Sequence, residues 1–499
     1  MTDQADELGP QHTPGPSAWD AALAAAIDHA KDYLAGLPDR PVAEQATVDE
    51  LREALAVPLP DEAVDPAKVV HDLAAGAEPG LVATGSPRYF GFVIGGALPA
   101  ALAADWLAAT WDQNAGLYAC GPPAAVVEEV AGRWVLDLLG LPSAATFGFV
   151  TGGQMANFTA LAAARHAVLA RQGWDVEARG LSGAPTVRVV TSDLRHATID
   201  RSLRYLGLGT DAAVVIPTGP DARLPVGALG DALEDLSADR PTPTIVCAQA
   251  GEVNSGAIDP LAEICDVAHA AGAWVHVDGA FGLWAAASPS LRPELAGVER
   301  ADSWATDFHK WLNVPYDSGF VACADSGAHR AAMGVRAAYL MHADDDPAAA
   351  RDQVDWNPEF SRRARGFAVY AALQSLGRRG VAELVERCCD CARQFAERLD
   401  RIDRVEVLND VTLDQVLVRF RAGSATGDPD PGADDAVTRR VVDAVQASGE
   451  CWMSGTTWQG GPAMRISVVN WQTTEADVDR SVRAIEAAVG GARRDDPVH

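Results

Sequence analysis

The sequence predicts an α/β protein whose large domain is built on a mostly parallel sheet of seven strands. Short apolar runs recur through the middle of the chain, and helical patterns such as 155–171 and 261–271 separate the early ones. Continuous apolar strands that alternate with helices are typical of parallel sheets covered on both faces. The runs are 146–151, 187–192, 213–218, 244–250, 273–278, 303–308 and 319–324. The last run follows closely on its predecessor and could be an antiparallel addition.

The regions that flank these strands are predicted to form separate units. Residues 1–18 are acidic and rich in Pro and Gly, which favours a disordered leader. Within an N-terminal helical segment at 19–93, residues 19–37 carry apolar side chains at helical spacing and end at G-L-P, a typical helix stop. We place the large domain at 94–366 and a smaller α+β domain at 367–499. The strand-like runs of the small domain are 405–408, 415–420 and 464–469.

Composition and charge restrict the possible functions. The chain has 499 residues, of which 48% are apolar, and a formal net charge of −29. This charge argues against nucleic acid and anionic membranes as partners, because both attract basic patches. No apolar run approaches the ~20 residues of a membrane span, and the first residues do not resemble a signal peptide, so we expect a cytoplasmic protein. The eight cysteines lack the spacing of a disulfide framework or a metal site, so we expect reduced thiols and no metal.

Glycines and polar side chains follow several predicted strands, at the positions where ligands bind in open α/β sheets. Gly152 and Gly153 lie between a strand and a helical pattern, where a helix N-terminus offers free N–H groups to an anion. A tight strand-to-helix turn explains the same glycines without a ligand. Taken singly, His196 and Asp278 also have structural explanations, as a structural imidazole and as an N-cap or turn carboxylate. The other polar residues at strand ends are Gln154, Asn254 and Lys310.

Lys310 gives this set of residues a chemical meaning. It stands beside Trp311 between two runs that are predicted as buried strands, and lysine is rarely buried without a partner. A desolvated lysine is more readily the neutral nucleophile. An amine for a Schiff base, a carboxylate for a ring nitrogen, a flat group over the ring and an anion cradle together match one cofactor, pyridoxal 5′-phosphate.

Two motifs carry a resemblance to a known family. H-V-D-G-A-F-G contains Asp278 and D-F-H-K-W-L contains Lys310, 32 positions further on (310 − 278). Together they resemble the group II pyridoxal-phosphate-dependent amino-acid decarboxylases, which include the aromatic-L-amino-acid, histidine and glutamate decarboxylases. The resemblance extends from about residue 86 to the C-terminal helix. It implies fold type I, the aspartate-aminotransferase-like fold, and a homodimer whose N-terminal helices wrap the partner and whose active sites are shared.

The same resemblance implies roles for the site residues. Lys310 would bind the cofactor aldehyde covalently, and Asp278 would pair with the pyridinium nitrogen. His196 would stack on one face of the ring, and Ala280 would pack on the other. Asn254 stands where the best-known members carry Thr, so its contact with the ring or the substrate carboxylate stays open. The residues in phosphate-binding positions are Gly152, Gly153, Gln154, Asp307 and His309.

Tyr339 bears on the reaction type. It lies 29 positions after Lys310 (339 − 310), where the decarboxylases that the chain resembles carry a mobile-loop tyrosine. That tyrosine is thought to help protonate the α-carbon after carbon dioxide leaves, whereas members with Phe there resemble oxidative aldehyde synthases. A core or surface tyrosine in a helix is the alternative interpretation. The expected reaction is therefore decarboxylation of an L-amino acid to the amine and carbon dioxide.

The segment R-Y-F-G-F-V-I-G-G-A-L-P aligns with a family loop that lines the substrate pocket. Phe92, Val93 and Ile94 make it apolar, and no Arg or Lys stands ready for a side-chain carboxylate, so an aromatic or apolar L-amino acid is favoured. Residues 111–114 depart from the aromatic decarboxylases, which leaves a polar or basic side chain open. Arg465 matches a family arginine whose role, structural or substrate-binding, the sequence does not separate.

Other functions share parts of this pattern. An aminotransferase would have the same fold, lysine and aspartate, but would need to return the amine reversibly. An aldehyde synthase or lyase of the same fold is a further alternative. A ligand-sensing transcription regulator would carry a basic helix-turn-helix module, and the sequence contains no such basic segment.

Overall fold

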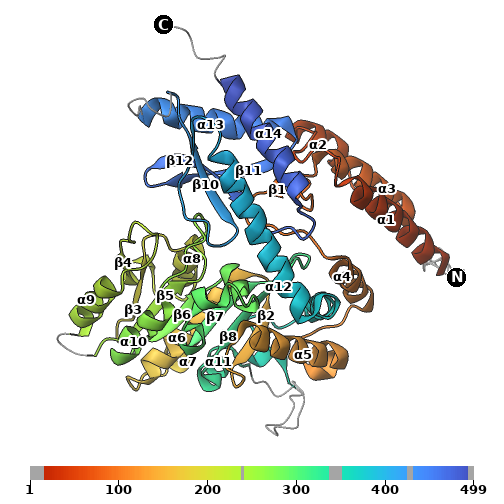
Figure 1. The fold of residues 1–499 in the computed structure, drawn as a ribbon. Helices are drawn as coiled ribbons and strands as arrows, with labels where there is room; N and C mark the ends of the chain where they lie inside the picture. The colour runs from red at the N-terminus through yellow and green to blue at the C-terminus, as the bar shows by residue number, and fades with distance from the viewer. Residues whose placement is uncertain (1–15, 238–240, 336–350, 424–430, 493–499) are drawn as a thin grey trace, which may run out of the picture.

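The computed structural model describes residues 16–237, 241–335, 351–423 and 431–492. The long helix α12 (Gly366–Leu399) runs between two sheets, and the N-terminal helices α1 (Pro16–Gly36) and α3 (Pro66–Ala77) extend away from both (Figure 1). Two further N-terminal helices are α2 (Val48–Leu55) and α4 (Pro99–Trp111). No helix in these ranges is long and apolar enough to cross a membrane.

The larger sheet has seven strands in the order β2-β8-β7-β6-β5-β3-β4. In chain order they are β2 Thr146–Val150, β3 Arg188–Ser192, β4 Ala213–Ile216, β5 Thr244–Gln249, β6 Trp274–Asp278, β7 Ser303–Asp307 and β8 Gly319–Cys323. Only β8 runs antiparallel to its neighbours, β2 and β7. The mostly parallel sheet is therefore confirmed, and the late antiparallel strand lies inside the sheet rather than at its edge.

Helices cover both faces of this sheet, because successive strand residues point to opposite sides. One core contains Val190, Val246 and Val275, which are neighbours across three strands, together with residues of α5, α9 and α10. A second core contains Val189, Ile245 and Trp274 with residues of α6 and α8. The helices of the large domain are α5 Pro122–Leu139, α6 Gly153–Ala170, α7 Val176–Arg179, α8 Ala197–Tyr205, α9 Val226–Ser237, α10 Leu261–Ala270 and α11 Ser326–Met333.

The second sheet, in the order β1-β11-β12-β10-β9, belongs mainly to the C-terminal part of the chain. The predicted strands near residues 405, 415 and 464 are present, but β11 was not predicted, because Ser, Gly and Thr interrupt its apolar pattern. β1 (Tyr89–Phe90) comes from the N-terminal segment and pairs parallel with β11. The other elements are β9 Val405–Val407, β10 Gln415–Phe420, β11 Trp452–Trp458, β12 Gly461–Ser467, α13 Pro431–Ser448 and α14 Glu475–Ala492.

Two arginines cover one edge of the larger sheet, that of β2. β2 is an edge strand, and unpaired edge carbonyls need hydrogen-bond donors. Arg362 donates to the carbonyl of Phe149 at 2.5 Å, and Arg351 donates to the carbonyl of Phe147. Both arginines belong to residues 351–365, which lie along this edge.

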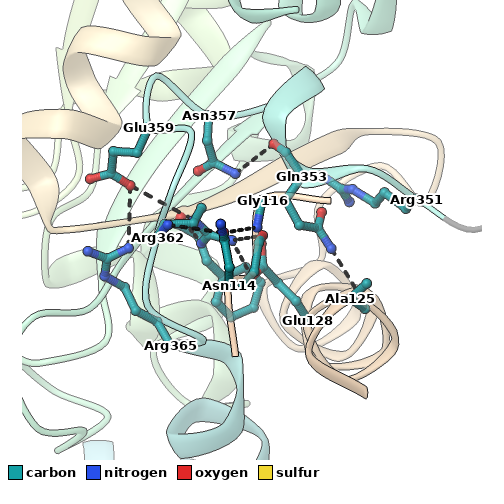
Figure 2. A network of polar contacts seen from close by, with 12 residues as sticks. Asn114, Gly116, Ala125, Glu128, Arg351, Gln353, Asn357, Glu359, Arg362 and Arg365 are labelled. Atoms are coloured by element: carbon teal, nitrogen blue, oxygen red, sulfur yellow. Dashed lines mark hydrogen bonds and ion pairs between the residues drawn. The ribbon is translucent and has the colours of Figure 1, made fainter. Parts of the chain in front are cut away.

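Arg362 is also half of a buried ion pair (Figure 2). Its Nη1 donates to Glu128 Oε2 at 2.8 Å, and the two side chains are each 1% exposed. Asn114 Oδ1 accepts the backbone N–H of Gly116 at 3.0 Å and that of Arg362 at 3.3 Å. The Arg362 guanidinium also donates to the carbonyl of Ala115 at 3.0 Å, so α5, the loop before it and the segment that covers β2 meet at this side chain.

Replacing Arg362 by Met should destabilise the fold by about 3–5 kcal/mol, because Glu128 would remain buried without its hydrogen-bonded cation. The double variant Arg362→Met, Glu128→Leu should recover part of this loss, since removing both charges is tolerated better than removing one. Urea unfolding measures both effects. Arg379→Met is a matched control, because its ion pair with Glu383 is 91% and 64% exposed, and should change stability little. A single Arg362 variant as stable as the parent would contradict this assignment.

Candidate active site

The predicted site residues meet at the carboxyl ends of the central strands. β6 ends at Asp278 and β7 ends at Asp307, three residues before Lys310. The two strands are parallel neighbours, with Asp278 beside Ala305 in the register. Helix α6 begins at Gly153, and His196 is the N-cap of α8. Residues that lie far apart in the sequence thereby meet at the carboxyl ends of the strands, as expected for an α/β fold.

Lys310 lies against the carboxylate of Asp307. Its Nζ is 2.9 Å from Asp307 Oδ2, and Asp307 Oδ1 accepts the N–H of Gly153 at 2.5 Å. The Asp307 side chain is 3% exposed and that of Lys310 19%. The buried carboxylate therefore joins the amine to the N-terminus of α6, whose dipole favours a negative charge. The chain contains three lysines, and the other two, Lys31 and Lys68, lie in α1 and α3.

Glycines allow the turn that carries Lys310 (residues 308–313, the lysine turn) to lie close to α6, β8 and the loop before α4. A Cβ on Gly153 would lie 2.9 Å from Asp307 Oδ2, and a Cβ on Gly319 would lie 2.5 Å from Cα of Gly152. A Cβ on Gly95 would lie 2.1 Å from the carbonyl oxygen of Lys310. These distances are shorter than Cβ atoms tolerate, so a larger residue would force α6, β8 or the loop before α4 away from the lysine turn.

Asp278 and His196 are oriented by hydrogen bonds. Asp278 Oδ2 accepts from Asn157 Nδ2 at 2.9 Å, and Oδ1 accepts the backbone N–H of Ala280 at 3.2 Å. His196 Nδ1 accepts the N–H of Thr198 at 3.3 Å. His196 is exposed to solvent. Desolvation by the surrounding protein lowers its pKa, the negative charge of Asp278 opposes this effect, and the positive charges of Lys310 and Arg465 add to it. It is therefore a neutral flat group near pH 7.

The residues around the anion cradle, which is formed by Gly152, Gly153 and the N-terminus of α6, fit a cofactor with an aldehyde, a ring nitrogen and a phosphate. His309 Nδ1 is buried and has no hydrogen-bond partner within the described part of the chain, so it can take a partner from a bound phosphate; the amide nitrogen of Gln154 is already engaged by Ser202 at 3.0 Å. The ring of His309 packs on Tyr316 with centroids 4.3 Å apart, and burial lowers the pKa of His309. Asp307, by contrast, is already engaged by Gly153 and Lys310. A direct contact between Asp307 and the phosphate remains a prediction.

Asn254 is placed between the two sheets. Its Nδ2 donates to Glu252 Oε1 at 3.0 Å, and its Oδ1 accepts from the Thr456 hydroxyl at 2.8 Å. Both ends of the amide are thus engaged by protein groups. Arg465, on β12, reaches the same loop, with Nη1 3.4 Å from the carbonyl of Val253. Burial lowers the pKa of Arg465, and the negative charge of Glu252 opposes that effect.

Asn157 is a site residue that the sequence analysis missed. It lies on α6 four residues after Gly153, so helical spacing places it on the same side of the helix as the cradle. Its Nδ2 contacts Asp278 Oδ2 at 2.9 Å and Thr198 Oγ1 at 3.0 Å. The spacing G-x-x-x-N was the available signal.

The three residues predicted to line the substrate pocket lie in different environments. Phe92 is 58% exposed and its ring lies 5.3 Å from that of Trp452, whereas Val93 is 1% exposed in the core. Ile94 lines a groove of about 710 Å³ together with Tyr316. Tyr339 lies outside the described residues, and its role stays a prediction.

Comparison with known proteins identifies the family. Residues 49–422 match the model of the pyridoxal-dependent decarboxylase conserved domain. An aromatic-L-amino-acid decarboxylase of Bacillus atrophaeus is 28% identical over 462 residues, covering 93% of each chain. An L-2,4-diaminobutyrate decarboxylase of Rhizobium meliloti (strain 1021) is 31% identical over 385 residues, 77% of this chain and 74% of the relative. The structure of Oryza sativa TDC with PLP and tryptamine superimposes with a TM-score of 0.89 at 25% identity, over 96% of this chain and 99% of that one.

These matches confirm fold type I, pyridoxal 5′-phosphate as the cofactor, and amino-acid decarboxylation as the reaction class. The matched region contains α6, Asp278 and Lys310, the elements from which the site was built above. The chain therefore belongs to the pyridoxal-dependent decarboxylase family.

Proposed function

We propose that this enzyme decarboxylates an aromatic or apolar L-amino acid to the corresponding amine. The observation that carries the proposal is the apolar loop at residues 92–94, because Gly95, which follows it, lies directly against the backbone carbonyl of Lys310. The groove of about 710 Å³ that Ile94 and Tyr316 help to line extends from this loop along α1, α3 and α4, and none of the residues predicted to bind the cofactor lines it. The relative from Bacillus atrophaeus, named for aromatic amino acids, supports the same substrate class.

A basic amino acid is the second candidate substrate. The Rhizobium meliloti relative is named for L-2,4-diaminobutyrate, and Glu78 lines the same groove. The Glu78 carboxylate already pairs with Arg40, with Oε1 3.3 Å from Nη2, so this candidate rests on the relative.

The roles proposed for the site residues follow their positions. When bound, pyridoxal 5′-phosphate supplies a ring that takes up the electron pair left when the bond between the α-carbon and the carboxyl group breaks. Lys310 Nζ would attach to the aldehyde, and Asp278 would face the ring nitrogen. His196 would cover the ring, with Ala280 on its other side.

The remaining roles are phosphate binding and delivery of the proton to the α-carbon. Gly152, Gly153, Gln154 and His309 surround the N-terminus of α6, where a phosphate is stabilised by N–H groups and the helix dipole. Tyr339 or Lys310 would deliver the proton that replaces carbon dioxide at the α-carbon. Asp307 keeps the Lys310 amine near the cradle through its 2.9 Å contact.

A homodimer with shared active sites is part of the proposal. Large apolar side chains of α1 and α3 are solvent-exposed in the single chain, and exposed apolar patches of this kind favour association. They include Trp19 at 69%, Leu34 at 45% and Leu73 at 61% exposure. A cytoplasmic location fits the eight free cysteines, because disulfides persist in oxidising compartments.

Reductive trapping should place the cofactor on Lys310. Borohydride treatment of the loaded enzyme, followed by digestion and peptide mass spectrometry, is expected to find the pyridoxyl group on the Lys310 peptide. The Lys31 and Lys68 peptides serve as internal controls and should stay unmodified. Lys310→Ala should lose both the adduct and the formation of amine. An adduct distributed over all three lysines would contradict the assignment.

The substrate is tested by incubating the loaded enzyme with single L-amino acids and identifying products by mass spectrometry. The panel contains tyrosine, tryptophan, DOPA, histidine, glutamate and 2,4-diaminobutyrate. We expect an amine that has lost one carbon dioxide from an aromatic substrate, and less amine from Tyr339→Phe. Amine formed only from 2,4-diaminobutyrate would select the second candidate. A keto acid that forms only when an amino acceptor is present would instead indicate an aminotransferase.

Light scattering should give about twice the chain mass of 52.3 kDa. Leu73→Glu, which places a charge on an exposed apolar position of α3, should lower this mass towards that of one chain and reduce activity in parallel. Glu53→Gln on α2, at an exposed polar position, is the control and should leave the mass unchanged. A single chain with full activity would contradict shared active sites.

A further inference from the structure

Buried hydrogen bonds run from Asp278 into the core of the large domain. Asn157 Oδ1, on the far side of the amide that contacts Asp278, lies 3.0 Å from His276 Nε2. His276 Nδ1 lies 3.0 Å from Ser303 Oγ, which also accepts the indole N–H of Trp274 at 2.9 Å. Asn157 is 1% exposed, and His276, Ser303 and Trp274 are fully buried. The network therefore crosses from α6 to β6 and β7 without access to solvent.

The chemistry of the Asp278 end determines the direction of each bond. A carboxylate only accepts hydrogen bonds, so the amide nitrogen of Asn157 faces Asp278 and its amide oxygen faces His276. His276 Nε2 must then carry a proton. Burial lowers the pKa of His276 to about 4, so the ring is neutral and its Nδ1 accepts from the Ser303 hydroxyl. Every donor thus points along the network towards Asp278, and aligned bonds of this kind polarise one another.

A branch of the network reaches His196. The second amide hydrogen of Asn157 points to Thr198 Oγ1, 3.0 Å away, and Thr198 Oγ1 lies 2.9 Å from His196 Nδ1. Because the backbone N–H of Thr198 also faces Nδ1, the proton of the neutral His196 ring lies on Nε2. Asn157 therefore connects the two side chains that are proposed to contact the cofactor ring.

Core stability alone does not explain these residues. Apolar side chains of similar volume would fill the same space without the desolvation of the polar groups of Asn157, His276, Ser303 and Trp274. The network instead satisfies each of its members and ends on a site carboxylate, where fixed donors determine both the orientation and the charge of the acceptor.

We propose that Asn157, His276 and Ser303 are positioning residues for the cofactor ring nitrogen, which they control through the Asp278 carboxylate. This inference rests on the proposed pairing of Asp278 with that nitrogen. Removing a member of the network leaves Asp278 with fewer or weaker donors, so its partner on the ring is held less firmly.

The test compares two cofactors on the apoenzyme: pyridoxal 5′-phosphate and its 1-deaza analogue, which has carbon in place of the ring nitrogen. Absorbance titration gives an apparent dissociation constant for each. Asn157→Leu and His276→Phe should each weaken binding of pyridoxal 5′-phosphate roughly 10-fold and leave binding of the analogue nearly unchanged. Ser303→Ala, one step further away, should give a smaller loss in the same direction. The ratio of the two constants is therefore the decisive readout.

Control variants separate positioning from folding. Thr159→Val is matched to Asn157, because Thr159 is buried on the same helix and its hydroxyl donates to the carbonyl of Met155 at 2.7 Å; its ratio should equal that of the parent. Equal losses for both cofactors in the network variants would indicate a structural role only and overturn the proposal. If His276→Phe does not fold, Ser303→Ala, which removes one hydroxyl, carries the test.

Asp278→Asn separates the pairing of Asp278 with the ring nitrogen from the role of the network behind Asp278. If this variant leaves the ratio unchanged, the pairing of Asp278 with the ring nitrogen is wrong, and the inference fails with it. If Asp278→Asn changes the ratio while the network variants do not, the pairing stands and only the inference about the network fails.

Discussion

The geometry of the site depends on one buried carboxylate, that of Asp307. Its side chain binds the first N–H of α6 and the amine of Lys310, and its backbone N–H donates to the carbonyl of Ala280 at 2.9 Å. The strand that ends at Asp278, the helix that forms the cradle and the lysine turn are therefore held at fixed distances from one another. A buried charge is stable only when it is paired and hydrogen-bonded, so each of these parts is needed by the others.

The turn that carries Lys310 is also hydrogen-bonded to the loop between β12 and α14. Asn313 is fully buried with a left-handed backbone (φ 54°), and its Nδ2 donates to the carbonyl of Val469 at 2.9 Å. Its Oδ1 accepts the N–H of Trp471 at 3.0 Å, and its carbonyl accepts the N–H of Leu98 at 2.8 Å. The position of Lys310 therefore depends on the start of the large domain, at Leu98, and on the C-terminal part of the chain, at Val469 and Trp471.

Arginine and lysine have separate uses in this chain. Of the 40 basic residues, 37 are arginines (40 − 3). The buried structural cations are arginines, such as Arg88, which donates to the carbonyls of Pro38 and Arg40 at 3.0 Å, and Arg362 in its pair with Glu128. A guanidinium has five donors in a fixed plane and stays protonated, so it can satisfy several acceptors at once. Lys310 is the only lysine between residues 94 and 366, so the proposed bond to the cofactor aldehyde falls to it.

The sequence by itself determined the sheet and the positions of the main reactive groups. Strand and helix periodicity are local properties, and residues that follow parallel strands must gather at one end of the sheet, so the sequence predicts that Asp278, His196 and Lys310 lie together; their roles toward the cofactor stay predictions. Only the tertiary structure decided which groups bind each other. Three features join distant segments: the pairing of β1 with β11, the arginines that bind the carbonyls of β2, and the network through Asn157. The sequence pattern of each segment does not indicate which other segment it contacts. Phe92 and Val93 show the same limit, because positive φ angles of 51° and 59° redirect side chains that a sequence pattern would place together.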